Sequence, residues 1–194
     1  PEQQEIVEIL DNSSRNLQKL IEQLLDYNRK QADGPIARET VNLAELVENV
    51  VSAHSLPARA KMMHTELLLS ERLCEAEPAL LVSVLDNLYS NAVHYGAESG
   101  NIRIHSYRHG EQVRIDVIND GEPIPSAERN MIFEPFYQGS HQRKGAVKGS
   151  GLGLSIARDC VRQMQGELSL VDEKSGLICF RITLPVAESG KNNV

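Results

Sequence analysis

The sequence predicts an α+β fold, in which a two-layer α/β sandwich follows one long amphipathic helix. Segments with a helical hydrophobic period occur between short segments of alternating polarity. This mixed order favours helices packed on a mainly antiparallel sheet over a doubly wound parallel sheet. The length of 194 residues agrees with one domain of about 150 residues and a helical appendage.

The N-terminal segment has the pattern of a long helix. Between residues 6 and 27, apolar side chains recur at alternating steps of four and three, and Ser13 is the one break in this heptad seam. Such a helix needs partner helices to bury its apolar stripe. Gly34 and Pro35 end it, because glycine caps helices and proline does not continue them. We expect residues 1–34 to form a helical linker or half of a helical hairpin from a dimeric bundle.

The sandwich is expected over residues 35–187, followed by a flexible tail at residues 188–194. Asn42 and Glu45 have the capping-box spacing that opens a helix after a first strand. Pro78 suits the first turn of a strongly apolar helix over residues 79–94. A last helix is expected over residues 151–164, and a brief helical stretch near Ile132. Strands are predicted at residues 39–43, 64–69, 102–107, 112–118, 167–171 and 177–184.

Net charge and cysteine content restrict the function. The formal charge of -7 at pH 7 argues against nucleic acid as a partner, because a phosphate backbone requires a basic surface. Three cysteines far apart in the sequence suit a reducing cytosol better than a disulfide framework. No apolar run approaches the roughly 18 residues that span a bilayer, so we expect no membrane contact within this sequence.

Two asparagines in the apolar helix are the first candidates for a binding site. Asn87 and Asn91 lie four residues apart and therefore on one helix face. Their carboxamide oxygens could hold a hydrated Mg²⁺, which prefers hard oxygen ligands. Taken alone, such a pair is usually no more than polar surface.

Glycines and basic residues form a second candidate site, near residue 150. Three alternating glycines open the last helix, where free N–H groups and the helix dipole favour a phosphate. A basic cluster precedes them in a chain that is acidic overall, which favours a loop closing over a triphosphate over an ordinary solvated loop. The glycines are Gly149, Gly151 and Gly153, and the basic residues are Arg143, Lys144 and Lys148.

These motifs occur in the order of a known family. The asparagine pair, the segment Asn119-x-Gly121-x-x-Ile124-Pro125, residues 133–137 and the glycines resemble the four boxes of the histidine-kinase catalytic domain. The resemblance covers about residues 40–186. It implies a Bergerat-type ATP-binding sandwich with ATP and Mg²⁺ as cofactors. The N-terminal helix is similar to the second helix of the family's dimerisation and phosphoacceptor hairpin.

The resemblance also implies roles for single residues. Asn91 would be the principal Mg²⁺ ligand in catalysis, with Asn87 beside it. Tyr95 would pack against the adenine, and His94 would face the phosphates. Gly121 and Ile124 would belong to the adenine pocket together with Asn119. Backbone approach to the phosphates is expected at Gly149, Gly151, Leu152 and Gly153, with counter-charges from Arg143, Lys144 and Lys148. Phe133 and Phe136 are expected to anchor the hinge of the basic loop in the core.

The implied reaction transfers the γ-phosphoryl group of ATP to a histidine and then to an aspartate of a response regulator. None of the six histidines is followed by an acidic residue, so we expect the acceptor histidine to lie on a helix outside this sequence. The expected partners are that phosphoacceptor helix, a second protomer in a dimer and the cognate response regulator. The chain would be the cytoplasmic portion of an inner-membrane sensor protein.

Two positions depart from the family pattern, and two other functions stay open. Asn119 stands where the family has its adenine-reading Asp, and Pro123 stands at a family Gly. We expect Asn119 to read the adenine through its carboxamide. The alternative is that Asp120, out of register by one residue, replaces it. The other functions are ATP hydrolysis, as in gyrases and chaperone ATPases that resemble one another in having Glu at the position of Asn87, and non-catalytic nucleotide binding.

Overall fold

The computed structural model describes residues 37–139, 151–171 and 176–187. The predicted N-terminal helix and the tail at residues 188–194 lie outside these residues. So do four of the expected phosphate-site residues, namely Arg143, Lys144, Lys148 and Gly149.

The larger sheet has five strands in the order β2-β4-β5-β7-β6. Their bounds are His64–Leu69 for β2, Asn101–His109 for β4, Gln112–Asp120 for β5, Leu177–Pro185 for β7 and Glu167–Val171 for β6. β2 runs parallel to β4, and the other neighbours are antiparallel. The prediction of a mainly antiparallel sheet is therefore confirmed.

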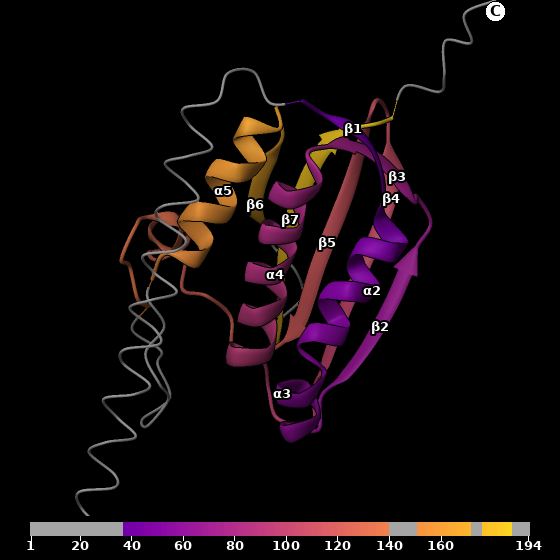
Figure 1. Ribbon diagram of the computed structural model, residues 1–194. Helices are drawn as coiled ribbons and strands as arrows, with labels where there is room; N and C mark the ends of the chain where they lie inside the picture. Colours follow the sequence, from indigo (N-terminus) through magenta and orange to yellow (C-terminus); the bar gives the residue numbers. More distant parts are fainter. Residues whose placement is uncertain (1–36, 140–150, 172–175, 188–194) are drawn as a thin grey trace, which may run out of the picture.

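Three helices lie side by side over one face of this sheet (Figure 1). They are α2 (Leu43–Ala53), α4 (Pro78–Tyr95) and α5 (Gly153–Gln163). The core between the layers consists of alternate strand residues such as Ile104 and Ile182 and of the apolar stripe of α4, including Leu81 and Leu88. This arrangement confirms the two-layer sandwich. Within the described part of the chain, no helix is long and apolar enough to cross a membrane.

The central helix α4 begins as its sequence predicts. The carboxylate of Glu77 accepts hydrogen bonds from the N–H groups of Ala79 and Leu80, and Pro78 occupies the first turn. These groups satisfy or replace donors that a helix N-terminus leaves unpaired. These bonds fix the first turn of the helix that carries Asn87 and Asn91 further along.

A second, two-stranded sheet pairs β1 (Glu39–Asn42) with β3 (Leu73–Ala76). β1 ends one residue before the predicted strand does, because the side chain of Asn42 accepts a hydrogen bond from Ala44 N at 3.1 Å and caps α2. β3 and the short helix α3 (Ser55–Ala60) were not predicted from the sequence, since both are too short to show a clear period.

The segment before α5 contains one correct and one wrong prediction. A turn of 3-10 helix, η1 (Met131–Phe133), lies at the expected brief helix, and Phe133 is buried in the core. Phe136 is not anchored in the core, because 70% of its surface is exposed. Its backbone is left-handed, with φ 65, and its N–H donates to Gly151 O at 2.9 Å. This local geometry directs the ring outward.

Candidate nucleotide-binding site

The two asparagines of α4 both have an available carboxamide oxygen. Asn87 and Asn91 are half-buried, in the third and fourth turns of the helix. The amino group of Asn87 donates to Ser83 O, one turn earlier, at 2.8 Å. Because this bond uses the donor half of the amide, the oxygen is left as a ligand or acceptor. The side chain of Asn91 makes no hydrogen bond to any described residue.

The glycine-rich start of α5 lies directly against Asn87. A Cβ atom at Gly153 would be only 2.8 Å from the Asn87 side-chain oxygen, so a side chain at position 153 would displace the Asn87 amide. Gly151 has a left-handed backbone, with φ +71, and a Cβ there would lie 2.7 Å from the carbonyl carbon of Phe136. The fold therefore brings the asparagine helix to the N-terminus of α5, where backbone N–H groups lack helical acceptors.

Leu152, the residue that precedes α5, has a buried side chain. Its carbonyl accepts the N–H of Ile156 and the hydroxyl of Ser155, which starts the helix. Any contact of Leu152 with a ligand would therefore have to involve its backbone rather than its side chain.

A second group of predicted residues lies at the C-terminal end of α4. Asn119 is the penultimate residue of β5 and is 3% exposed on the helix-covered face. A Cβ atom at Gly121 would lie 3.1 Å from the Asn119 amide nitrogen and 3.6 Å from the Tyr95 carbonyl oxygen. Asn119, Gly121 and the C-terminal end of α4 are thus in one neighbourhood. Ile124 packs against the same core, half-buried.

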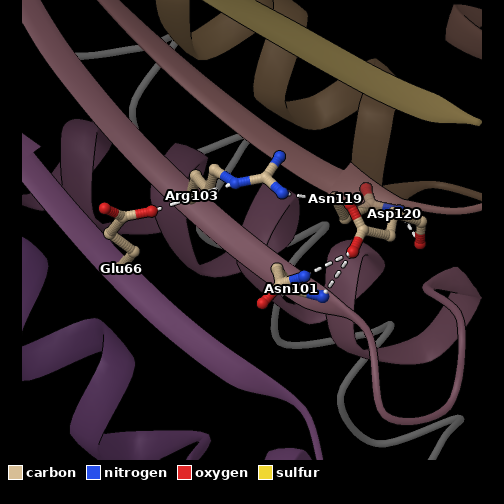
Figure 2. Close-up of polar contacts among 5 residues, drawn as sticks. All are labelled: Glu66, Asn101, Arg103, Asn119 and Asp120. Carbon is tan, nitrogen blue, oxygen red and sulfur yellow. Dashed lines mark hydrogen bonds and ion pairs between the residues drawn. The ribbon is translucent and has the colours of Figure 1, made fainter.

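Asp120 has a structural environment of its own (Figure 2). Its carboxylate accepts the backbone N–H of Asn101 at 2.8 Å, the Asn101 amide at 2.7 Å and Arg103 at 3.4 Å. Partial burial alone would raise the pKa of Asp120, but the bonds from Asn101 and the charge of Arg103 outweigh it and lower the pKa. All of these partners tie the end of β5 to the start of β4.

His94 and Tyr95 end α4 with their rings in an edge-to-face contact, 4.6 Å between centroids. The Tyr95 ring is 49% exposed and so is free to stack on a ligand. The ammonium of Lys61 donates to Val93 O at 2.8 Å and to His94 O at 2.6 Å, capping the helix. Burial, and secondly the charge of Lys61, lower the pKa of His94, so its ring is neutral at pH 7.

The residues present suit a magnesium nucleotide. Among the described residues, no three His, Cys, Asp or Glu side chains gather where they could hold a metal ion. The available oxygen donors of α4 are instead the amides of Asn87, beside the start of α5, and Asn91, and Mg²⁺ can be held by few protein oxygens together with water and phosphate. This donor set therefore fits Mg²⁺ delivered with a nucleotide, but would not hold a softer metal.

The structure thus places most of the described candidates along the C-terminal half of α4 and on the segments that adjoin it, the start of α5 and the end of β5. Sequence reasoning missed the groups that support them. Lys61, Asn101 and Arg103 belong to no motif, and only the strand register and the end of α4 show what they contact. Asp120 was considered only as the alternative adenine-reading residue, not as a group that positions Asn119.

Comparison with known proteins agrees with this geometry. Residues 76–188 match the family described as "Histidine kinase-, DNA gyrase B-, and HSP90-like ATPase". The chain is 73% identical over 191 residues to "Sensor histidine kinase GlrK" of Escherichia coli (strain K12). It has the same identity over the same length to "Sensor histidine kinase QseE" of Escherichia coli O157:H7. Each alignment covers 98% of this chain and 40% of the relative, so the chain spans well under half of these proteins.

Solved structures of a further histidine kinase, ThkA, share the fold. The ThkA catalytic domain superimposes with a TM-score of 0.68 and 27% identity, covering 78% of this chain and 97% of that domain. ThkA in complex with the response regulator protein TrrA gives a TM-score of 0.73 at 25% identity, covering 92% of this chain and 50% of that one.

Proposed function

Because this chain belongs to the histidine kinase-, DNA gyrase B- and HSP90-like ATPase family, we propose that it is the ATP-binding catalytic part of a sensor histidine kinase. It would transfer the γ-phosphoryl group of ATP to a histidine on a helix outside this sequence. The identity of 73% to two sensor histidine kinases supports this choice within the family. The activity is a proposal, because the chain covers 40% of those relatives.

One observation carries the proposal: the oxygen of Asn87 faces the start of α5 across Gly153. A triphosphate lying beside this contact would meet the amide oxygens of α4 and the N–H groups at the start of α5. Mg²⁺, held by Asn91 with Asn87 beside it, would neutralise charge that develops on the phosphates. The protein's own contribution is to position the phosphates and to approach them closely at glycine.

The adenine would lie at the C-terminal end of α4, beyond Asn91. Tyr95 offers a half-exposed ring, and Ile124 an apolar contact. Asn119 offers its amide oxygen to the amino group of adenine, while Gly121 leaves room beside that amide. Asp120 is unsuited to this role, because its carboxylate is already engaged by Asn101 and Arg103.

Transfer is favoured over hydrolysis by the chemistry of Asn87. Hydrolysis needs a base that takes a proton from water, and a carboxamide cannot take up that proton. A neutral imidazole needs no such base, since it is itself the nucleophile in phosphoryl transfer.

The remaining partners follow from this role. The chain would work with its phosphoacceptor helix, a second protomer and a cognate response regulator. The ThkA–TrrA complex is an example of a kinase of this fold bound to a response regulator. We place the domain on the cytoplasmic side of an inner-membrane sensor, without nucleic acid or membrane contact of its own.

The test is transfer in trans. The chain is mixed with ATP, Mg²⁺ and a separately made phosphoacceptor hairpin, with a hairpin lacking the acceptor histidine as control. We expect acid-labile label on the intact hairpin alone and none on the chain itself. Rapid phosphate release, on the order of ~10 per second, with an unlabelled hairpin would instead identify an ATPase. Absence of any nucleotide binding would contradict the proposal entirely.

A further inference from the structure

A backbone group sets the orientation of the Asn119 carboxamide. Its amino nitrogen donates to the carbonyl oxygen of Asp120 at 3.2 Å. Only the nitrogen half of an amide can donate, so the oxygen half points the other way. No described residue donates to that oxygen. Reversing the amide would place two acceptor oxygens, those of Asn119 and Asp120, against each other.

The Asp120 carbonyl is itself held in place. It accepts a second hydrogen bond, from Ala97 N at 2.8 Å, just beyond the end of α4. The Asp120 side chain is fixed by Asn101 and Arg103, and Arg103 lies 3.9 Å from Glu66 on the edge strand (Figure 2). These contacts reach across β2, β4 and β5. Asp120 therefore has little freedom to rotate at the end of its strand.

The contacts of Asp120 with Asn101, Arg103, Ala97 N and the Asn119 amide are called the Asp120 clamp below. We propose that this clamp makes the nucleotide site selective for a 6-aminopurine, with Asp120 as the positioning residue. The inference rests on the proposed function, in which Asn119 faces the base. A fixed Asn119 offers an acceptor only, which matches the 6-amino group of adenine and opposes a 6-oxo group. A freely turning amide would pair with either purine. The clamp gives an uncharged residue the selectivity of a carboxylate without the burial of a charge.

Asp120 could instead only tie β4 to β5. In that case its loss would weaken all nucleotides alike and leave their ratio unchanged. The ratio is therefore the informative quantity. ADP and IDP suit the measurement, because they differ only at purine position 6 and the adjacent ring nitrogen, and neither carries a γ-phosphoryl group to transfer.

The experiment measures ADP and IDP affinity by titration calorimetry in the presence of Mg²⁺. Wild type should prefer ADP. In Asp120→Ala the amide could adopt two orientations, so ADP affinity should fall by no more than about twofold. IDP affinity should rise by about tenfold, because the carbonyl of residue 120 would keep its bond from Ala97 N but lose the side-chain anchors, and could then move away from the reversed amide. Arg103→Gln should change the ratio in the same direction but less. If Asp120→Ala does not fold, Arg103→Gln provides the test.

Two controls separate positioning from a structural role. Arg108, on the same strand as Arg103, makes an exposed ion pair with Glu111 of the following turn, and Arg108→Gln should leave the ratio unchanged. In an Asn119→Asp background no amide can turn, so adding Asp120→Ala should no longer alter the ratio. An equal change in both backgrounds, or wild type without preference for ADP, would overturn the inference and leave the proposed function standing. A wild type that binds neither nucleotide would refute the proposed function instead.

Discussion

Two buried polar residues of β5, Asp116 and Asn119, lie three residues apart on opposite faces of the sheet. Asp116 is 5% exposed, on the face away from the helices, and its two oxygens receive Arg181 Nε and Nη2, each at 2.7 Å. Tyr107 adds a third bond, at 3.4 Å. These bonds, with the charge of Asp116, raise the pKa of Arg181.

Asn119 is as deeply buried as Asp116, but only one of its two polar side-chain atoms has a hydrogen-bond partner. Its nitrogen has one partner, and its oxygen has none among the described residues. A buried charge has to be paired, whereas a neutral amide can keep one atom open at a smaller cost. We therefore expect the Asp116 pair to contribute to stability and the open Asn119 oxygen to contribute to ligand binding. Each prediction below tests one side of this contrast.

The largest effect is expected at the paired charge. Arg181→Met would leave Asp116 buried without its cation, and the loss of one partner of such a pair usually costs about 3–5 kcal/mol. We expect about 3 kcal/mol, at the low end of that range, because one-fifth of Arg181 is exposed. Urea denaturation measures the change. Nucleotide affinity should not change.

The matched control replaces both charges. Asp116→Leu with Arg181→Met should recover most of the lost stability, since an apolar pair of similar volume needs no compensation. If Arg181→Met alone is as stable as wild type, the Asp116–Arg181 pair is solvated. The pair would then not contribute to stability, and the contrast with Asn119 would be wrong.

Asn119→Ala should have the opposite profile. It removes the acceptor offered to adenine, so ADP affinity should fall by roughly 1–3 kcal/mol, the cost of an unpaired buried polar group. The free energy of unfolding should change much less than in Arg181→Met. Calorimetry and urea denaturation on the same protein check both parts. If stability falls as far as affinity, Asn119 is a core residue and not a ligand residue.

Asn91→Ala applies the contrast to the asparagine pair of α4. This amide also lacks a described partner, so its removal should leave stability unchanged. The Mg²⁺-dependent part of nucleotide affinity should fall about tenfold, or about 1.4 kcal/mol. Titrations with and without Mg²⁺ separate that part. Ser90→Ala, one residue away on the same helix, is the control. Equal Mg²⁺ dependence in wild type and Asn91→Ala would remove Asn91 from the metal site.

The sequence alone could predict the helices, the strands and the motif residues, but not the hydrogen bonds and ion pairs that hold the motif residues in place. Strand β2 and strand β6 have their predicted bounds, because alternation and turn residues are local signals. The Asp116–Arg181 pair joins residues 65 apart in the chain, and only the β5–β7 register brings them together. The amide orientation of Asn119 likewise depends on one backbone carbonyl, which no pattern of residue types reveals.

Phe136 shows why a correct motif can still mislead. Its position beside Phe133 suggested a second core anchor, yet its left-handed backbone and its bond to Gly151 direct the ring into solvent. Hydrophobic residues are inside only where the backbone permits it. The glycine at position 151, noticed for phosphate binding, is also what allows this close contact.

The smallest effect concerns His94, a neutral group at the binding end of α4. Its pKa is lowered by burial and then by Lys61, so the folded state takes up this proton less readily than the unfolded chain. The contribution of neutral His94 to stability is complete above its unfolded pKa of about 6.5 and is lost as pH falls through the lower folded pKa.

Lys61→Met should raise the pKa of His94 without returning it to the unfolded value, because burial remains the larger cause. It should also remove a helix cap worth below about 1 kcal/mol. NMR titration of the imidazole measures the first effect, and denaturation at pH 8 measures the second. Lys61→Arg, which keeps the charge, should resemble wild type in both. If the His94 titration in Lys61→Met matches that of wild type, Lys61 acts on α4 only as a cap, and the neutrality of this end of the site comes from burial alone.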